Sequence, residues 1–410
     1  MSYSFIGGYF LNPYIQQFED ALNLAAVRHD DSVVTVTPTA GERPKKPYSL
    51  VRSGNVGYTA IILFAREPER IEDVLEAEVG FGAADMGNKG AVGLRCVFNK
   101  GKGGEKGEIT LVATHLAAME WNLAKRNANW AAIVRGLTFA NPEEVVERHR
   151  NGHGTPSVEE GEADSERTHL LGDTTLGGDD EHVRLQREIH DLSVFKPSAH
   201  LFVAGDLNYR ISTTSPPPGA AFPSLDPESE NFYPKFLHRD QLTREKKAGR
   251  TLHGLSEADI SFPPTYKYDV TVGKNGEVDW SFAPHRYPGW TDRVLFLDTP
   301  TRSEKKVQVL AYDAFPVLAS SDHRPVYLRA LVPLLPAAEM TTHLEADDPR
   351  VRLPVEIDPE AWERRKTARR REAMLGWSTI LWSTKEGALV LGGVVALGAG
   401  WWWLSQTGKP

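Results

Sequence analysis

With 410 residues, the chain is long enough for one large buried core or two modest ones. Its 40% hydrophobic and 25% charged residues fit an ordinary globular protein, and a formal net charge of −8 argues against a dedicated DNA or RNA binder. The single cysteine, Cys96, excludes an intramolecular disulfide and fits a reducing compartment such as the cytosol.

The first third of the chain alternates predicted helices and strands. Residues 1–10 lack the basic start and long apolar core of a signal peptide. Apolar spacing predicts a helix over residues 14–27, and another helix is expected around Arg126 and Asn127. Strands are expected at residues 48–52, 58–64, 90–98 and 109–114. This order indicates α/β layers packed as one domain.

A short stretch at residues 201–210 is the strongest candidate for chemistry. Residues 201–204 form an apolar run typical of a buried strand, and Gly205 allows a sharp turn after it. Asp206 and Asn208 stand two apart, so on an extended backbone they project to the same side. Such a carboxylate and amide can position and deprotonate one water. The alternative is an ordinary Asp/Asn turn after a strand.

A second polar stretch lies at residues 319–328, beside a predicted strand at 326–328. Asp322 and His323 offer a hydrogen-bond acceptor and an imidazole whose pKa is near neutrality. An Asp next to a His is common and by itself carries little information. Residues 262–268 and 288–295 are expected to be loops that mix aromatic and basic residues.

The remaining segments are expected to lie outside the catalytic body. Residues 151–180 read as a solvated insertion, and residues 336–386 as a linker with a basic helix that contains Arg364–Arg371. Residues 387–404 carry no charge and would span roughly 27 Å as a helix at ~1.5 Å per residue. That length suits a C-terminal membrane anchor with the body in the cytosol. The alternative is a glycine-rich amphipathic or buried helix.

Six motifs in order along residues 5–332 together resemble one family. They are NKG at 88–90, THLAA at 114–118, GDLNYRI at 205–211, PTYKY at 264–268, WTDRVL at 290–295 and SDHRPV at 321–326. Each motif alone would be unspecific, but the ordered set resembles the inositol polyphosphate 5-phosphatases of the endonuclease/exonuclease/phosphatase superfamily. With its C-terminal helix, the chain looks like the fungal tail-anchored type that acts on phosphatidylinositol 4,5-bisphosphate.

The resemblance implies a DNase I-like four-layer sandwich of two packed β-sheets flanked by helices. It places the catalytic domain at residues 1–335, followed by the linker at 336–386 and the anchor at 387–404. It also implies Mg²⁺-dependent hydrolysis of the 5-phosphate of a phosphoinositide lipid at a cytosolic membrane face, with endoplasmic reticulum as the expected location. No nucleic-acid partner is expected.

The resemblance also assigns roles to individual residues. Asp206 would activate the attacking water and Asn208 would hold it. His323, oriented by Asp322, would stabilise or protonate the scissile phosphate, which His115 would contact. The remaining matched positions would grip neighbouring ring phosphates: Asn88, Lys89, Tyr266, Lys267 and Arg293. Which of Asp206 and His323 handles the proton stays open.

Two positions depart from the family pattern. The glutamate that serves the family as main Mg²⁺ ligand would lie upstream of Met1, so the metal ligands are unknown and the sequence reads as a truncated product. Met119 stands where the family often has a second histidine. Two alternatives therefore remain: a phosphoinositide-binding membrane protein with impaired catalysis, and a nuclease of the same fold. The acidic charge balance and the membrane tail disfavour the nuclease.

Overall fold

The centre of the protein is a six-stranded sheet in the order β3-β4-β5-β6-β10-β7. The computed structural model describes residues 11–31, 46–101, 104–152, 176–300, 303–342 and 344–407. The strands of this sheet are β3 (Ile71–Gly80), β4 (Gly90–Asn99), β5 (Lys106–His115), β6 (Ala199–Asp206), β7 (Leu255–Ser256) and β10 (Asp292–Leu297). β5 and β6 pair in parallel, and the other neighbours pair antiparallel.

Two hairpins form a second β layer on one face of this sheet. They are β1 (Ser49–Val56) with β2 (Thr59–Ala65), and β11 (Gln308–Ala314) with β12 (Val326–Leu331). The first contacts β3, β4 and β5, and the second contacts β10. A third hairpin consists of β8 (Tyr268–Val272) and β9 (Val278–Phe282).

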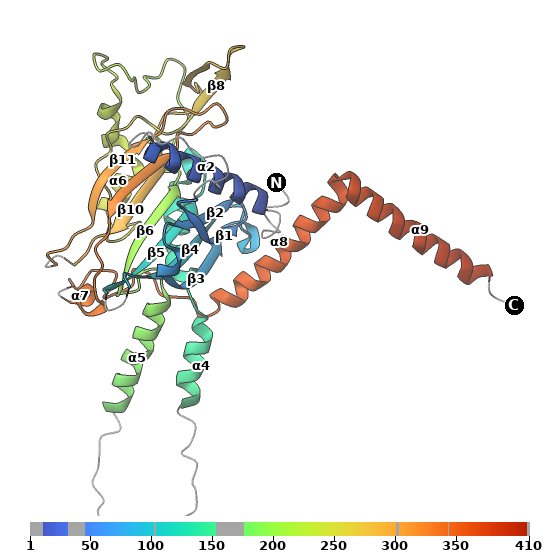
Figure 1. The fold of residues 1–410 in the computed structure, drawn as a ribbon, viewed down its shortest axis with the longest axis horizontal. Helices are drawn as coiled ribbons and strands as arrows, with labels where there is room; N and C mark the ends of the chain where they lie inside the picture. The colour runs from blue at the N-terminus through green and yellow to red at the C-terminus, as the bar shows by residue number, and fades with distance from the viewer. Residues whose placement is uncertain are drawn as a thin grey trace, which may run out of the picture.

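Helices cover both β layers. α2 (Asn12–Asp31) lies next to the β1–β2 hairpin (Figure 1), and α3 (Leu123–Gly136) packs against the six-stranded sheet through the main core. The other α-helices are α4 (Pro142–Gly152), α5 (Leu176–Leu192), α6 (Gln241–Lys247), α7 (Ala337–Thr341), α8 (Ala361–Ser383) and α9 (Lys385–Thr407). Short 3₁₀ turns are η2 (Pro68–Arg70), η3 (Ala83–Asp85), η4 (Glu120–Asn122) and η5 (Tyr233–Arg239). The expected sandwich of two β layers flanked by helices is confirmed.

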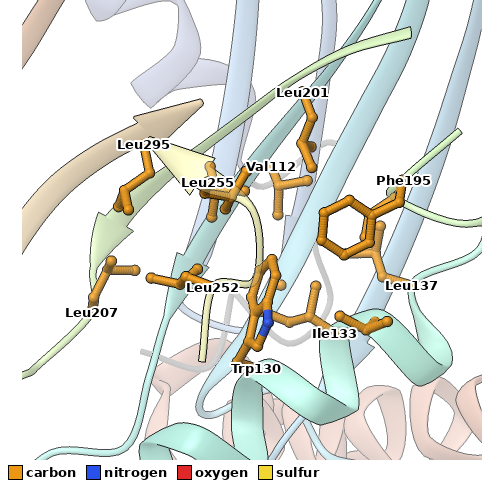
Figure 2. Close-up of a cluster of buried hydrophobic side chains, with 14 of the residues drawn as sticks. Val112, Trp130, Ile133, Leu137, Phe195, Leu201, Leu207, Leu252, Leu255 and Leu295 are labelled. Carbon is orange, nitrogen blue, oxygen red and sulfur yellow. The ribbon is translucent and has the colours of Figure 1, made fainter. Parts of the chain in front are cut away.

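The main core lies between the six-stranded sheet and α3 (Figure 2). Trp130, Ile133 and Val134 face it from α3 at the spacing of one helical face. Trp130 is fully buried and meets the Phe195 ring edge to face, with centroids 6.0 Å apart. Alternate side chains of each strand point to this face, and the side chains between them point to the other face, which the hairpins cover.

Most expected elements are present, with two differences. The helix at 14–27 and the strands at 90–98 and 109–114 fall within α2, β4 and β5, and the strands at 48–52 and 58–64 begin one residue before β1 and β2. The segment 288–295, expected to be a loop, instead contains the start of the central strand β10. Residues 176–180 of the expected insertion belong to α5, whereas residues 153–175 lie outside the described part of the chain.

The C-terminal part contains two long helices. α8 extends the expected basic helix by about one turn at one end and several at the other, and its first half lies against the body of the protein (Figure 1). α9 follows after Thr384 and leads away from the body. Residues Gly387–Gln406 within it are long and apolar enough to cross a membrane, by length and composition, and almost all are exposed.

Candidate active site

The register of four neighbouring strands brings polar residues into one row at the edge of the central sheet. Gly90 of β4 pairs with His115 of β5, His115 pairs with Asp206 of β6, and Asp206 pairs with Asp292 of β10. Adjacent strands are about 4.8 Å apart. The row therefore places two carboxylates and an imidazole within reach of one small ligand, although they come from distant parts of the sequence.

The turn after β6 depends on Gly205. Its φ is +142°, and a Cβ atom there would lie 1.9 Å from the carbonyl oxygen of Thr114 on the neighbouring strand. Only glycine fits this close approach of two backbones. Asn208 then adopts φ +56°, a left-handed conformation that Asn tolerates better than most residues. This turn points Asp206 and Asn208 at each other.

Asp206 is held by a set of hydrogen bonds. It accepts from the Asn208 backbone N–H at 3.0 Å and from Asn208 Nδ2 at 2.9 Å. His115 Nε2 lies 3.2 Å from Asp206 Oδ2, and the amine of Lys89 contacts the same imidazole ring. Lys89, His115, Asp206 and Asn208 thus form one continuous cluster.

His323 faces this cluster from the loop before β12. Its Nδ1 lies 2.9 Å from Asp292 Oδ2, which also accepts from the hydroxyls of Thr265 at 2.7 Å and Thr291 at 2.8 Å. Backbone bridging between His323 and Tyr266 fixes the loop. Their rings lie 4.5 Å apart between centroids. The bond to Asp292 fixes which way the imidazole faces.

The expectation that Asp322 orients His323 is therefore wrong, because Asp292 is the hydrogen-bonding partner. Asp322 instead accepts a 2.6 Å hydrogen bond from Lys267 Nζ. Lys267, expected to grip a phosphate, is engaged by this carboxylate at the edge of the site. Asn208, expected to hold the water, uses its amide to bind Asp206, the Leu116 carbonyl at 3.1 Å, and Arg210.

Arg293 does not reach the site. Its side chain is 1% exposed and makes two 2.6 Å hydrogen bonds to Glu257 and one of 3.1 Å to Asp240. The expectation that it binds a ring phosphate is wrong, because its three guanidinium nitrogens all donate to the buried carboxylates of Glu257 and Asp240. Arg293 instead secures β10, on which Asp292 stands.

Of the expected substrate-binding residues, Lys89 belongs to the cluster and Tyr266 lies beside His323. Asn88 is exposed on the loop before β4, and its side chain accepts from the Lys89 backbone N–H at 3.0 Å. The Tyr266 ring is stacked 4.4 Å from the Arg210 guanidinium. Arg210 is almost fully buried, and its Nη1 has no hydrogen-bond partner among the residues that the structure describes.

Sequence reasoning missed Asp292, Thr265, Thr291 and Arg210 as site residues, although all four lie in the quoted motifs. The Thr291-Asp292 pair stood in a segment expected to be a loop, so its position at the start of a central strand was not foreseen. The signal was present, because the apolar run 294–297 directly after Asp292-Arg293 is typical of a buried strand. Asp292 stands at the start of its run, whereas Asp206 stands after the run 201–204.

The charges of the cluster oppose one another. Burial disfavours the ionised form of Asp206, but the hydrogen bond with His115 and the positive charges around it outweigh burial and lower its pKa. Burial and the nearby charge of Asp206 raise the pKa of Asp292. Burial would lower the pKa of His323, but its bond to Asp292 and the neighbouring carboxylates raise it. Burial lowers the pKa of Lys89.

No group of three or more His, Cys, Asp or Glu side chains among the described residues is arranged to hold a metal. Asp206 and Asp292, neighbours in the row, are the carboxylates that fit Mg²⁺, since this ion often uses one or two carboxylates together with waters and substrate phosphate. Burial and, after it, the charge of Asp206 raise the pKa of Asp292, and a bound cation would offset both effects.

Known proteins of similar sequence identify the family of this chain. Residues 12–329 match the model of Endonuclease/Exonuclease/phosphatase family 2. The chain belongs to this family. It is 29% identical over 296 residues to type I inositol polyphosphate 5-phosphatase 13 of Arabidopsis thaliana, covering 69% of the chain and 23% of that protein. It is 29% identical over 286 residues to synaptojanin of Caenorhabditis elegans, covering 69% and 19%.

These relatives are much longer than the matched segment, so the chain spans about a fifth of their length. Among solved structures, the inositol polyphosphate 5-phosphatase domain of SPsynaptojanin, in complex with inositol (1,4)-bisphosphate and calcium, is 25% identical. The match covers 73% of this chain and 64% of that one, with a TM-score of 0.43.

The His323–Asp292 pair gives a pH-dependent prediction. Because the folded pKa of His323 is raised above its ordinary 6.5, the pair contributes stability that is fully present below about pH 6.5 and is lost as pH rises through the folded pKa. We expect His323→Gln to lower the free energy of unfolding more at about pH 6 than at about pH 9. Urea unfolding at both pH values measures this, and an equal loss at the two would contradict it.

The buried position of Arg293 gives a second prediction. Arg293→Met leaves Glu257 and Asp240 without their cation, so the free energy of unfolding should fall by about 3–5 kcal/mol. The matched control is Arg148→Met, whose pair with Glu188 is exposed on both sides; it should change stability by less than about 0.5 kcal/mol. A stable Arg293→Met protein with only a raised KM would restore the substrate-binding role.

Proposed function

We propose that this protein hydrolyses the 5-phosphate of phosphatidylinositol 4,5-bisphosphate at a cytosolic membrane face. The observation that carries the proposal is the convergence of the Lys89–His115–Asp206–Asn208 cluster with the His323–Asp292 pair at one edge of the sheet. The relatives are named as inositol polyphosphate 5-phosphatases, that is, phosphoric monoester hydrolases, and their substrate class supports the choice of a phosphoinositide.

In this mechanism Asp206 is the base. Its lowered pKa keeps it ionised, and Asn208 fixes its orientation so that it can accept a proton from a water aimed at phosphorus. His323 has a raised pKa and is held by Asp292, so it carries positive charge toward the phosphate and can donate a proton to the leaving oxygen. Opposite pKa shifts thus separate the two roles.

The neighbouring residues bind the substrate. Lys89 places an ammonium group beside His115, where it can neutralise a phosphate as a point charge. Tyr266, stacked on Arg210, forms an aromatic wall next to His323. Lys267 and Asn88 lie at the rim and are proposed to contact a neighbouring ring phosphate, Lys267 after exchanging Asp322 for it.

Mg²⁺ is the proposed cofactor, held by Asp206 and Asp292 together with waters and substrate. When bound, it supplies positive charge that offsets the dianion of a phosphate monoester. The residues described above still perform the binding, the orientation and the proton transfer. The proposed partner is a phosphoinositide lipid, whose headgroup carries the phosphates. The acidic charge balance argues against nucleic acid.

The membrane location rests on α9. Its apolar segment Gly387–Gln406 is proposed to span a bilayer, with the catalytic body on the cytosolic side because Arg370 and Arg371 precede the segment. Its modest length suits the thin membrane of the endoplasmic reticulum, about 27 Å. We therefore propose a tail-anchored enzyme of the fungal type that the motifs resemble.

Removal of the proposed base gives the decisive test of activity. We expect Asp206→Ala to lower phosphate release from phosphatidylinositol 4,5-bisphosphate in mixed micelles with Mg²⁺ by about 10²–10⁴-fold, because general-base catalysis contributes that much. Asp226→Ala, an exposed aspartate in a remote loop, is the matched control and should leave the rate unchanged. Equal rates for all three proteins would mean that this site does not catalyse the hydrolysis, and nicking of plasmid DNA would favour the nuclease.

Truncation tests the anchor. A protein that ends at Thr384 should move from the vesicle pellet to the supernatant after a high-salt wash, whereas the full chain should stay with phosphatidylcholine vesicles. Because α9 leads away from the body, the truncated protein should hydrolyse soluble inositol 1,4,5-trisphosphate within about twofold of the full chain. Full-chain protein in the supernatant would overturn the anchor.

A further inference from the structure

Helix α8 is attached to the catalytic body by buried charges. Residues at one-face spacing are buried along its first half: Ala361, Arg365, Ala368, Glu372 and Gly376. Arg365 donates a 2.6 Å hydrogen bond to Glu78 of β3 and two bonds, of 2.8 and 2.9 Å, to Glu372. Arg369 also donates to Glu78 at 2.9 Å. These contacts fix the helix against the edge strand of the central sheet.

Glu372 makes one further contact, outside the helix and the ion pairs. Its Oε1 accepts a 2.6 Å hydrogen bond from the backbone N–H of Gly87, and the side chain is 4% exposed. The opposite side of Gly87 packs against the β1–β2 turn, where a Cβ on Gly57 would lie 1.7 Å from the Gly87 carbonyl oxygen. The backbone at Gly87 is therefore held from two sides.

The loop that contains Gly87 leads directly to the candidate active site. It is closed by backbone hydrogen bonds from Phe81 to the Lys89 carbonyl at 2.8 Å and from Gly82 to the Met86 carbonyl at 2.8 Å. Lys89, two residues after Gly87, contacts His115, and His115 bonds to Asp206. An unbroken series of contacts thus runs from Glu372 to the proposed base.

We propose that Glu372 is a positioning residue for the phosphate-binding loop: it fixes Gly87 and thereby places the Lys89 ammonium beside His115 and Asp206. This inference rests on the proposed function and adds to it a helix outside the matched family segment, which ends at residue 329. A buried ion pair contributes little net stability when desolvation is counted. It does fix geometry, because each carboxylate oxygen of Glu372 has a defined donor.

The kinetic test uses the full chain in detergent micelles with soluble inositol 1,4,5-trisphosphate and Mg²⁺, so that membrane contact does not enter. Glu372→Ala should raise KM about tenfold with a smaller loss in kcat, because a displaced Lys89 binds phosphate less well. Glu372→Gln keeps an acceptor for Gly87 and should recover part of the affinity. Glu363→Ala removes an exposed glutamate of the same helix and should match the wild-type protein.

A double-mutant cycle separates positioning from general destabilisation. In a Lys89→Ala background, Glu372→Ala should change KM by less than about twofold, because the group through which it acts is gone. A purely structural role would produce the same relative loss in both backgrounds. That result, or an unchanged KM for Glu372→Ala alone, would overturn the proposal.

A readout without turnover distinguishes this inference from the proposed function. Amide hydrogen exchange of the loop 82–90 should become at least about tenfold faster in Glu372→Ala and stay unchanged in Glu363→Ala. Calorimetric binding of inositol 1,4,5-trisphosphate should weaken in parallel. If the wild-type chain shows no hydrolysis, the proposed function fails, and these two measurements still decide the inference: unchanged loop exchange and unchanged binding overturn it.

Discussion

The parallel pairing of β5 with β6 is the constraint on which the site depends. It brings the backbone of Gly205 against that of Thr114 so closely that no side chain fits between them, and this contact sets the register of the row. With that register, His115 and Asp206 end side by side, and β10 then adds Asp292 opposite Asp206. A shift by one residue would turn each of these side chains to the other face of the sheet. The chemistry therefore depends on backbone packing before it depends on any side-chain contact.

The charged residues in and around this row fall into two groups, one structural and one in the candidate active site. Beneath the site, Arg293 joins β10 to Glu257 and Asp240 and keeps the strand in place. Within the site, the carboxylates are left close together, so that one is readily ionised and the other resists ionisation. The first network is almost fully buried, with the side chains of Arg293 and Asp240 at most 1% exposed, whereas those of Asp206 and Asp292 are 18% and 19% exposed and can meet a ligand. That difference in exposure separates structural from functional arginines and aspartates in this fold.

Local signals predicted the strands and the first candidate residues: apolar runs predicted β5 and β6, and the polar residues after β6 pointed to Asp206 and Asn208. The sandwich of two β layers and the role of His115 were expected only from the resemblance carried by the six motifs. Long-range partners could not be predicted in this way, since Asp292 reaches His323 only through the sheet order. Arg293 was misassigned for the same reason: a basic residue in a motif gives no sign of a buried carboxylate beyond it. The docking of α8 escaped notice because its buried stripe contains Arg365 and Glu372 in place of apolar residues.

If α9 spans a bilayer, as proposed, the attachment of α8 to β3 determines how the catalytic body moves relative to that bilayer. Because the first half of the helix is fixed, only the last seven residues of α8, about 10 Å at ~1.5 Å per residue, separate the body from the elbow at Thr384. An enzyme on such a short helical connection reaches only the lipids directly beneath it, unlike one on a long flexible linker. Its turnover in the cell would then depend on lateral diffusion of lipids to the active site and on the surface density of the enzyme.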